Sequence, residues 1–136
     1  LDFGGEFVIS ILVNNTLPQI EQELIYMLNG VLKKVLGKGT AKMGLRIVDD
    51  MILVKASGIL SNQEKLILKG GEGPSLIRMY KEKALQAGQE IIYREIADLF
   101  AVVYPTGTYF DLNVEKDEAI IVINLSDNLE SKLKHR

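Results

Sequence analysis

Residues 43–56 read MGLRIVDDMILVKA, and this stretch decides the fold. Apolar and polar residues alternate over residues 43–48, as they do in a strand with one buried face. A second apolar run covers residues 51–56, and only Asp49 and Asp50 separate the two. Such a short connection needs a positive φ, which Asp tolerates better than most residues other than Gly. The stretch therefore predicts an antiparallel hairpin with one buried face and one mixed face.

A long helix is expected before this hairpin. Thr16 and Gln19 have the spacing of a capping box, and Gly37 can supply the left-handed stop after Leu36. The segment between them carries two apolar stripes: Ile20, Leu24, Met27, Val31 and Val35, and then Leu17, Ile25, Leu28, Leu32 and Leu36. A surface helix shows one stripe. This helix is therefore expected either to be buried under two layers or to be shared with a second subunit.

Two further helices are expected after the hairpin. Ser61 and Glu64 form a second capping box that opens a short helix to residue 69. Pro74 then stands near the start of a long helix. Its expected buried stripe consists of Ile77, Tyr80, Ala84, Ala87, Gly88, Ile91 and Leu99. The small Ala87 and Gly88 predict close packing, and Lys81 is grouped with the charges of a solvated face.

A second hairpin closes the fold, with strands over residues 108–114 and 118–125. Residues 127–136 are polar and are expected to form a frayed tail. The whole pattern predicts the α+β class: a two-layer sandwich in which two long helices and one short helix cover an antiparallel sheet of two hairpins. The domain is expected to span residues 16–126.

Residues 1–15 are expected to contain a strand, EFVISILV at residues 6–13. Residues 5–17 resemble residues 117–129, with identities that include Ile9 with Ile121 and Ile11 with Ile123. Two interpretations stay open. Either two amphipathic strands look alike by composition, or residues 1–15 end a preceding copy of the domain.

Composition excludes several classes of protein. The chain has 136 residues, with 16 Lys and Arg against 18 Asp and Glu, and a net charge of -2. This length predicts one domain, and the charge argues against nucleic-acid binding. The chain has no Cys and one His, His135, so thiolate metal sites and thiol nucleophiles are excluded. No apolar run is long enough to insert into a membrane.

The glycine-rich segments do not match nucleotide-binding motifs. Residues 37–40 (GKGT) resemble a phosphate loop, but Leu32 stands where the first Gly of that motif belongs. Residues 70–73 (GGEG) are interpreted as a hinge between helices. The pair Asp49 and Asp50 offers too few oxygen ligands for a cation. No catalytic residue, metal site or cofactor is predicted.

One group of charged residues remains as a candidate ligand site. Asp111 lies in an apolar strand, where a buried carboxylate would need a basic partner. The available partners are Arg46, Lys55, Arg78 and Arg94. A structural ion pair is favoured over a catalytic acid. If the protein binds a small ligand, these five residues are expected to hold it between the sheet and the long helix.

Three stretches resemble the MpsC-like family of small bacterial domains: residues 37–39 (GKG), residues 48–51 (VDDM), and residues 58–61 (GILS) followed by Glu64 and Leu66. The resemblance covers residues 18–126. The sequence departs from the family at two turn positions, because Asp49 replaces a Gly and Thr40 replaces a Pro. The resemblance carries over no catalytic residue, because none is established for the family, and family members with two tandem copies would fit the likeness between residues 5–17 and 117–129.

The resemblance implies a cytoplasmic accessory protein linked to membrane sodium or bicarbonate transport. The first hypothesis is therefore a non-enzymatic interaction protein. It would act as a homodimer or tandem pseudo-dimer, with a membrane protein as a possible partner. The alternative is a regulatory domain that senses a small ligand.

Overall fold

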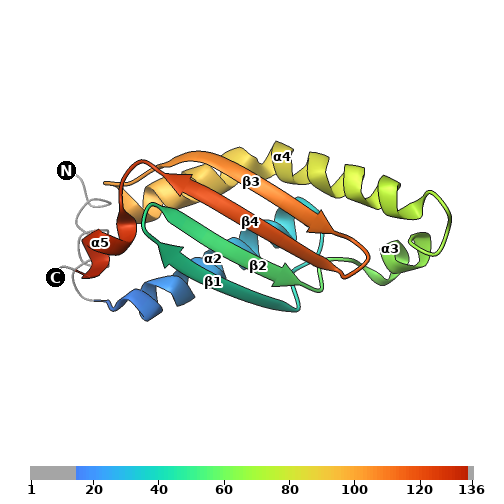
Figure 1. Ribbon diagram of the computed structural model, residues 1–136, viewed down its shortest axis with the longest axis horizontal. Coiled ribbons are helices and arrows are strands. Elements are labelled where there is room, and N and C mark those ends of the chain that lie inside the picture. The colour runs from blue at the N-terminus through green and yellow to red at the C-terminus, as the bar shows by residue number, and fades with distance from the viewer. Residues whose placement is uncertain (1–14, 135–136) are drawn as a thin grey trace.

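The computed structural model describes residues 15–134. The expected strand at residues 6–13 and His135 lie outside the described part, and so does most of the segment 5–17 that resembles residues 117–129. The elements follow the predicted order (Figure 1). They are α2 (Leu17–Leu36), β1 (Lys42–Val48), β2 (Met51–Ser57), α3 (Asn62–Ile67), α4 (Gly73–Phe100), β3 (Pro105–Asn113), β4 (Glu118–Leu125) and α5 (Leu129–Lys134). Both expected capping boxes, at Thr16 and at Ser61, are present.

The four strands form one antiparallel sheet in the order β1-β2-β4-β3. Both hairpins are confirmed, and the positive φ predicted for the first turn occurs at Asp49 (53°); in the second turn Asp117 also has a positive φ (55°). The two hairpins meet along β2 and β4, where Val54 pairs with Ile121. The predicted α+β class is confirmed.

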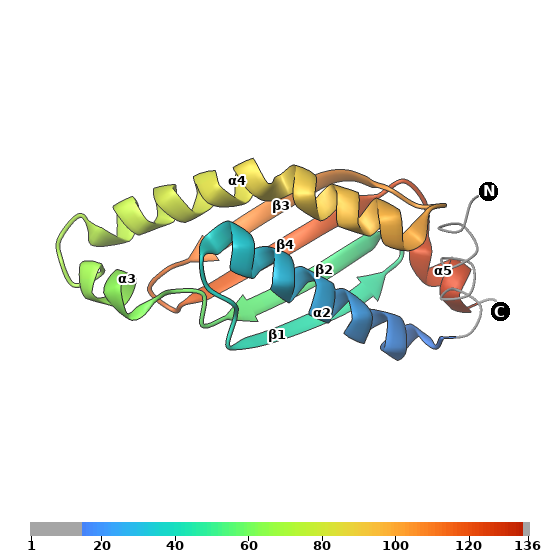
Figure 2. The same cartoon turned by 180° about the vertical axis from the view of Figure 1, so that it is seen from behind.

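The helices α2 and α4 lie side by side on one face of the sheet, and the opposite face carries no helix of the described chain (Figures 1 and 2). α2 lies over β1, and α4 lies over β3. The inner face of the sheet and the facing sides of both helices make one core. Helix α3 lies against α4 near the end of the sheet, and none of its residues is buried.

The two stripes of α2 are explained within the chain. Leu24 from one stripe and Leu28 and Leu32 from the other are at most 1% exposed. Because α2 packs against α4 as well as β1, both sides of the helix are covered. Of the two expectations for α2, burial between layers describes this structure.

The predicted close approach along α4 occurs at Gly88. A Cβ atom there would lie 2.4 Å from a methyl carbon of Val35 on α2. Ala87 is exposed and takes no part in the contact. A single small residue therefore sets the distance between the two long helices.

The predicted buried stripe of α4 is partly wrong. Tyr80 is 64% exposed, whereas the buried positions are Ile77, Lys81, Leu85, Gly88, Ile92, Ile96 and Phe100. Lys81, which the sequence analysis placed on a solvated face, is 1% exposed. Charge balance alone is a poor guide here because a charged side chain can be buried when a partner meets it.

The expectation of a frayed polar tail after Ser126 is also wrong. Residues 129–134 form α5, and Leu129 and Leu133 are buried. The helix is tied to the β1–β2 turn, where the backbone N–H of Asp49 donates to Glu130 Oε1 at 2.9 Å. Two leucines four residues apart after Asn128 were the available sequence signal.

We expect Leu133→Ala to lower the free energy of unfolding by about 2 kcal/mol, because it empties a buried position near the end of the chain. Lys132→Ala is the matched control, since Lys132 is exposed and its ion pair with Asp127 lies at the surface. Urea unfolding of both variants gives the comparison. Equal stability of the two would contradict the docking of α5.

None of the helices within residues 15–134 is both long enough and apolar enough to cross a membrane.

Candidate functional site

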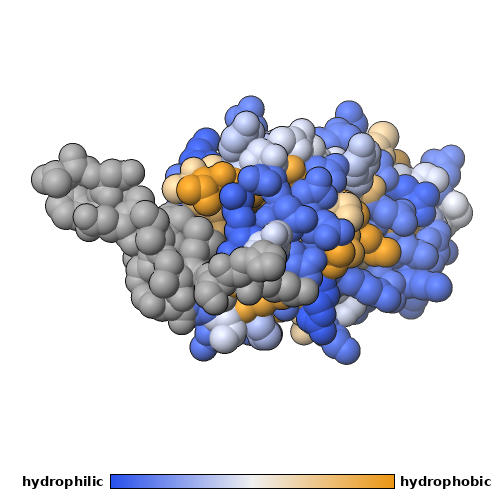
Figure 3. Space-filling model, turned by 60° about the vertical axis from the view of Figure 1, so that its left-hand side comes forward, coloured by the Kyte–Doolittle hydropathy of each residue, from blue (hydrophilic) through white to orange (hydrophobic). Residues whose placement is uncertain are grey.

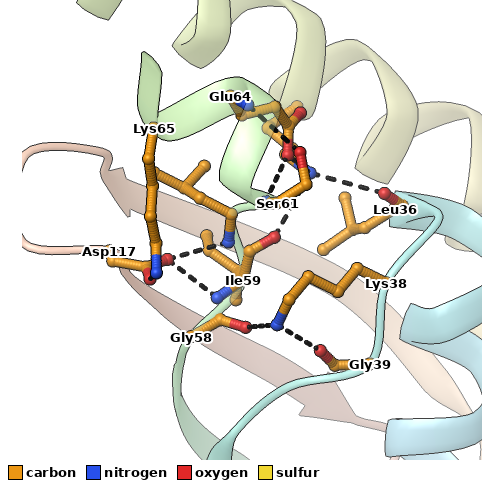
Figure 4. Close-up of polar contacts among 11 residues, drawn as sticks. Leu36, Lys38, Gly39, Gly58, Ile59, Ser61, Glu64, Lys65 and Asp117 are labelled. Atoms are coloured by element: carbon orange, nitrogen blue, oxygen red, sulfur yellow. Dashed lines mark hydrogen bonds and ion pairs between the residues drawn. The ribbon is translucent and has the colours of Figure 1, made fainter. Parts of the chain in front are cut away.

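The segment after β2, residues 58–61 (GILS), is held by side chains from distant parts of the chain (Figure 4). Asp117, in the β3–β4 turn, accepts hydrogen bonds from the backbone N–H groups of Ile59 and Leu60, both at 2.8 Å. Gly58 has φ of 69°, and a Cβ there would lie 2.3 Å from Ala41 Cβ. The turn therefore needs glycine for both its conformation and its packing.

Lys38 joins this segment to the end of α2. Its Nζ donates to the Gly58 carbonyl oxygen at 2.6 Å and to the Gly39 carbonyl oxygen at 3.1 Å (Figure 4). The GKG and GILS stretches, which the sequence analysis treated as separate motifs, are thus in direct contact. In this structure the lysine of GKG fixes a loop and is not part of a phosphate loop, because a helix precedes it and a strand follows.

The buried Lys81 is the centre of the arrangement. Its Nζ lies 2.9 Å from Glu64 Oε1, and the two side chains are 1% and 13% exposed. The same ammonium donates to the carbonyl oxygens of Leu36 and Ile59, both at 3.3 Å. One lysine on α4 therefore links α3, the end of α2 and the GILS segment. We call Lys38, residues 58–61, Glu64, Lys81 and Asp117 the polar junction.

The electrostatics of Glu64 are set by its partners. Burial raises the pKa of the Glu64 carboxyl, but the Ser61 backbone N–H and the Lys81 ammonium outweigh burial and hold the pKa below its usual value of 4.5. The Ser61 N–H donates to Glu64 Oε1 at 2.9 Å. Glu64 is therefore ionised at neutral pH and pairs with Lys81.

This lowered pKa predicts a pH dependence. The Glu64 contribution to stability is present above the unfolded-state pKa, near 4.5, and is lost as pH falls through the lower folded-state pKa. We expect the stability difference between the wild type and Glu64→Gln to be largest near neutral pH and to narrow as the pH falls below about 4.5. Urea unfolding across this range measures it.

Glu90→Gln, at an exposed position of α4, is the control for that series. A wild-type advantage over Glu64→Gln that did not change as the pH falls below 4.5 would contradict the lowered pKa of the Glu64 carboxyl.

A hollow of ≈ 610 Å³ adjoins the polar junction between α3, the start of α4 and the end of α2. Its apolar lining comes from Leu36, Ile67, Leu76, Ile77, Met79 and Tyr80. Tyr80 is 64% and Met79 52% exposed, so much of this lining faces solvent. Ser61 and Glu64 bring the polar junction to the wall of the hollow.

The five predicted ligand residues do not converge. Arg46, Lys55 and Asp111 lie on the face of the sheet that carries no helix, whereas Arg78 and Arg94 lie on α4, on the other side of the sheet. Asp111 is exposed, which corrects the expectation of a buried carboxylate: its side chain points away from the core, as strand alternation requires. Arg78 pairs with Glu115 at 4.0 Å. Within residues 15–134, no three acidic or histidine side chains are grouped as metal ligands.

The family model described as "Na+-translocating membrane potential-generating system (MpsC)" matches residues 16–127, which include the complete polar junction. The chain belongs to the MpsC family. Membership suggests a role linked to a sodium-translocating system that generates a membrane potential. The resemblance noted from the GKG, VDDM and GILS stretches is thereby confirmed.

A curated relative of the chain is a protein of Bacillus subtilis (strain 168) described as the uncharacterized protein YbcI. It is 26% identical over 115 residues, which cover 85% of this chain and 92% of the relative. No solved structure matches the chain significantly.

Sequence reasoning missed Lys81 as the central residue of this MpsC domain. The signal was its phase, because Ile77, Lys81 and Leu85 follow one another at intervals of four residues, as buried positions of a helix do. A lysine in such a stripe needs an acidic partner, and Glu64 of the capping box has that role.

Proposed function

We propose that this MpsC domain is a non-enzymatic, cytoplasmic accessory protein that binds a membrane-protein component of a sodium-translocating system. The observation that carries the proposal is the exposed apolar surface around the hollow. Tyr80, Met79, Leu76 and Ile67 are 64%, 52%, 50% and 42% exposed, and all four line the hollow, from α3 and the start of α4. Exposed apolar patches of this kind mark sites of protein–protein interaction.

The buried charged side chains make contacts that stabilise the fold. This supports an interaction role for the protein. Lys81 is bonded to Glu64 and two carbonyl oxygens. Glu21, 7% exposed on α2, accepts a hydrogen bond from the Ile47 backbone N–H at 2.8 Å. Among the described residues, no buried side-chain nitrogen or oxygen lacks a partner. The surface is then the part of the molecule that is available for function.

The test is complementation of a deletion strain of the bacterium that carries the gene. We expect the wild type to restore the sodium-dependent membrane potential, measured with a potentiometric dye, and Met79→Glu/Tyr80→Glu to fail. Gln86→Glu/Ala87→Glu, at exposed positions of the same helix, adds the same charges and should restore it. An unchanged sodium-dependent potential in the deletion strain would overturn the proposal.

A second candidate function is the sensing of a small ligand in the hollow. Its volume of ≈ 610 Å³ is within the range of small-molecule sites, and Ser61 and Glu64 add polar groups to an apolar lining. A bound metabolite would raise the melting temperature, because it stabilises only the folded state. A thermal-shift screen tests this function. A ligand that stabilises the wild type but not Leu76→Trp, which adds bulk at a half-exposed position of the lining, would favour ligand sensing over protein binding.

A further inference from the structure

We propose that two copies of this chain associate through the open face of the sheet. The open face consists of the side chains of β1, β2, β4 and β3 that point away from α2 and α4 (Figure 1). This surface is separate from the hollow, so the inference goes beyond the proposed function. It also replaces α2 as the contact surface, because both stripes of α2 are already covered within the chain.

The centre of the open face is apolar. Strand pairing places Leu53, Val122 and Tyr109 in one row across β2, β4 and β3, and Ile120 lies beside Val122 in the next row. Tyr109 is 68% exposed and Ile120 is 43% exposed. With the end of the molecule on the left of Figure 1 turned forward, Figure 3 shows several hydrophobic patches within a surface that is mainly hydrophilic. Covering this centre would remove apolar area from water.

The charges of the open face are divided between its two halves. The charged side chains from β1 and β2 are Lys42, Arg46 and Lys55, and all three are basic. Those from β4 and β3 are Glu118 and Asp111, and both are acidic. Lys55 Nζ lies 3.9 Å from Glu118 Oε2, where the two halves meet. The face is thus basic on one side of its apolar centre and acidic on the other.

This division makes the face complementary to itself. A twofold axis parallel to the strands, between β2 and β4, would place the basic half of one copy over the acidic half of the other. Arg46 would then lie over the partner's Tyr109, where a cation–π contact is favourable. The partner's Asp111 would lie over Gly44, which has no side chain to obstruct it, and beside Lys55.

The same charges disfavour the other face-to-face arrangement. A twofold axis perpendicular to the strands would place β1 over β1 of the second copy, so that Arg46 and Lys42 would meet like charges. The charges therefore favour the dimer whose twofold axis is parallel to the strands. The mean strand directions of two such sheets would cross at about 30°, as in other aligned sheet packings.

The dimensions of the open face predict a dimer of modest strength. Four strands of this length cover roughly 20 Å by 25 Å. Interfaces of standard size bury about 800 Å² of accessible surface on each partner, so this contact would be at the small end of the range. We therefore expect the dimer to dissociate on dilution and to weaken at about 0.5 M salt, because screening reduces its charge contacts.

Charge reversal of the full chain tests the proposal by sedimentation velocity over a concentration series. Arg46→Glu/Lys55→Glu makes the face acidic, and Asp111→Lys/Glu118→Lys makes it basic. Each variant alone should associate at least about tenfold more weakly than the wild type, because like charges would meet. An equimolar mixture of the two variants should restore the dimer.

The control is Lys83→Glu/Arg94→Glu, which makes the same charge change on exposed positions of α4 and should dimerise as the wild type does. Thermal unfolding of each variant establishes that it is folded; all altered positions are exposed except Glu118, whose side chain is 33% exposed. A wild type that stays monomeric at its highest soluble concentration would overturn the proposal. So would charge-reversed variants that dimerise as the wild type does, since the contact would then lie at a strand edge or elsewhere.

Discussion

Replacing Lys81 with Met is expected to lower the free energy of unfolding by about 3 kcal/mol and the melting temperature by roughly 10 °C. Met has a similar volume, so the change removes the ammonium and leaves little cavity. The Glu64 carboxylate would lose the group 2.9 Å away, and the Leu36 and Ile59 carbonyl oxygens would each lose a donor. A buried charge without its partner is costly because the protein interior solvates it poorly.

Two further variants separate the ion pair from other effects of the change at Lys81. Lys83→Met is the matched control: Lys83 is exposed two residues further along α4, and we expect a change within about 0.5 kcal/mol. Glu64→Gln combined with Lys81→Met should recover part of the loss, because a neutral amide can still accept the Ser61 N–H without a buried charge. Urea unfolding of the three variants completes the comparison. A loss below about 1 kcal/mol for Lys81→Met would contradict the central role of this lysine.

Gly88→Leu is the second large expected effect, with a loss of more than about 3 kcal/mol. A Cβ atom at Gly88 would already lie 2.4 Å and 2.8 Å from the two γ-carbons of Val35, so a larger side chain must push α2 away from α4. Both helices are anchored in the core beneath, at Leu32 and Leu85 among others. The helices therefore cannot separate without opening the core.

A smaller change at the same place gives a sharper test. Gly88→Ala gains about 1 kcal/mol of helix propensity but meets Val35, so we expect a net loss, and Val35→Ala in the same chain should restore stability. Gly30→Ala is the control, because Gly30 lies in α2 with no atom within 4 Å of the added carbon, and it should stabilise by up to about 1 kcal/mol. Gly88→Ala that stabilised as much as Gly30→Ala would contradict the close contact.

Much of the fold could be predicted from the sequence because the signals are local. The capping boxes at Thr16 and Ser61 each involve residues three positions apart. The turn at Asp49 depends on the positive φ of that residue, which Asp tolerates. Alternation along β1 and β2 shows which side chains share a face. The α+β class follows from the order of these elements.

The candidate site could not be predicted in the same way. Glu64 and Lys81 are seventeen positions apart in the chain. Asp117, in the turn between β3 and β4, accepts hydrogen bonds from residues 59 and 60, which are 58 and 57 positions earlier. The four basic residues Arg46, Lys55, Arg78 and Arg94 looked like one group with Asp111 because each has the opposite charge. Which layer each of these residues occupies depends on how the strands pair and where the helices pack, and the sequence alone does not give that.

The helices and strands from α2 to β4, their order and the family could be predicted from the sequence alone, since they depend on residues close together in the chain. Only the tertiary structure decided that Lys81 is inside, that α5 packs on the body, and that the charges of the open face are divided between its halves. The physical reason is that burial and pairing depend on which distant segments meet. A lysine has the same chemistry at every position, and its neighbours in space decide whether it is solvated or holds three segments together.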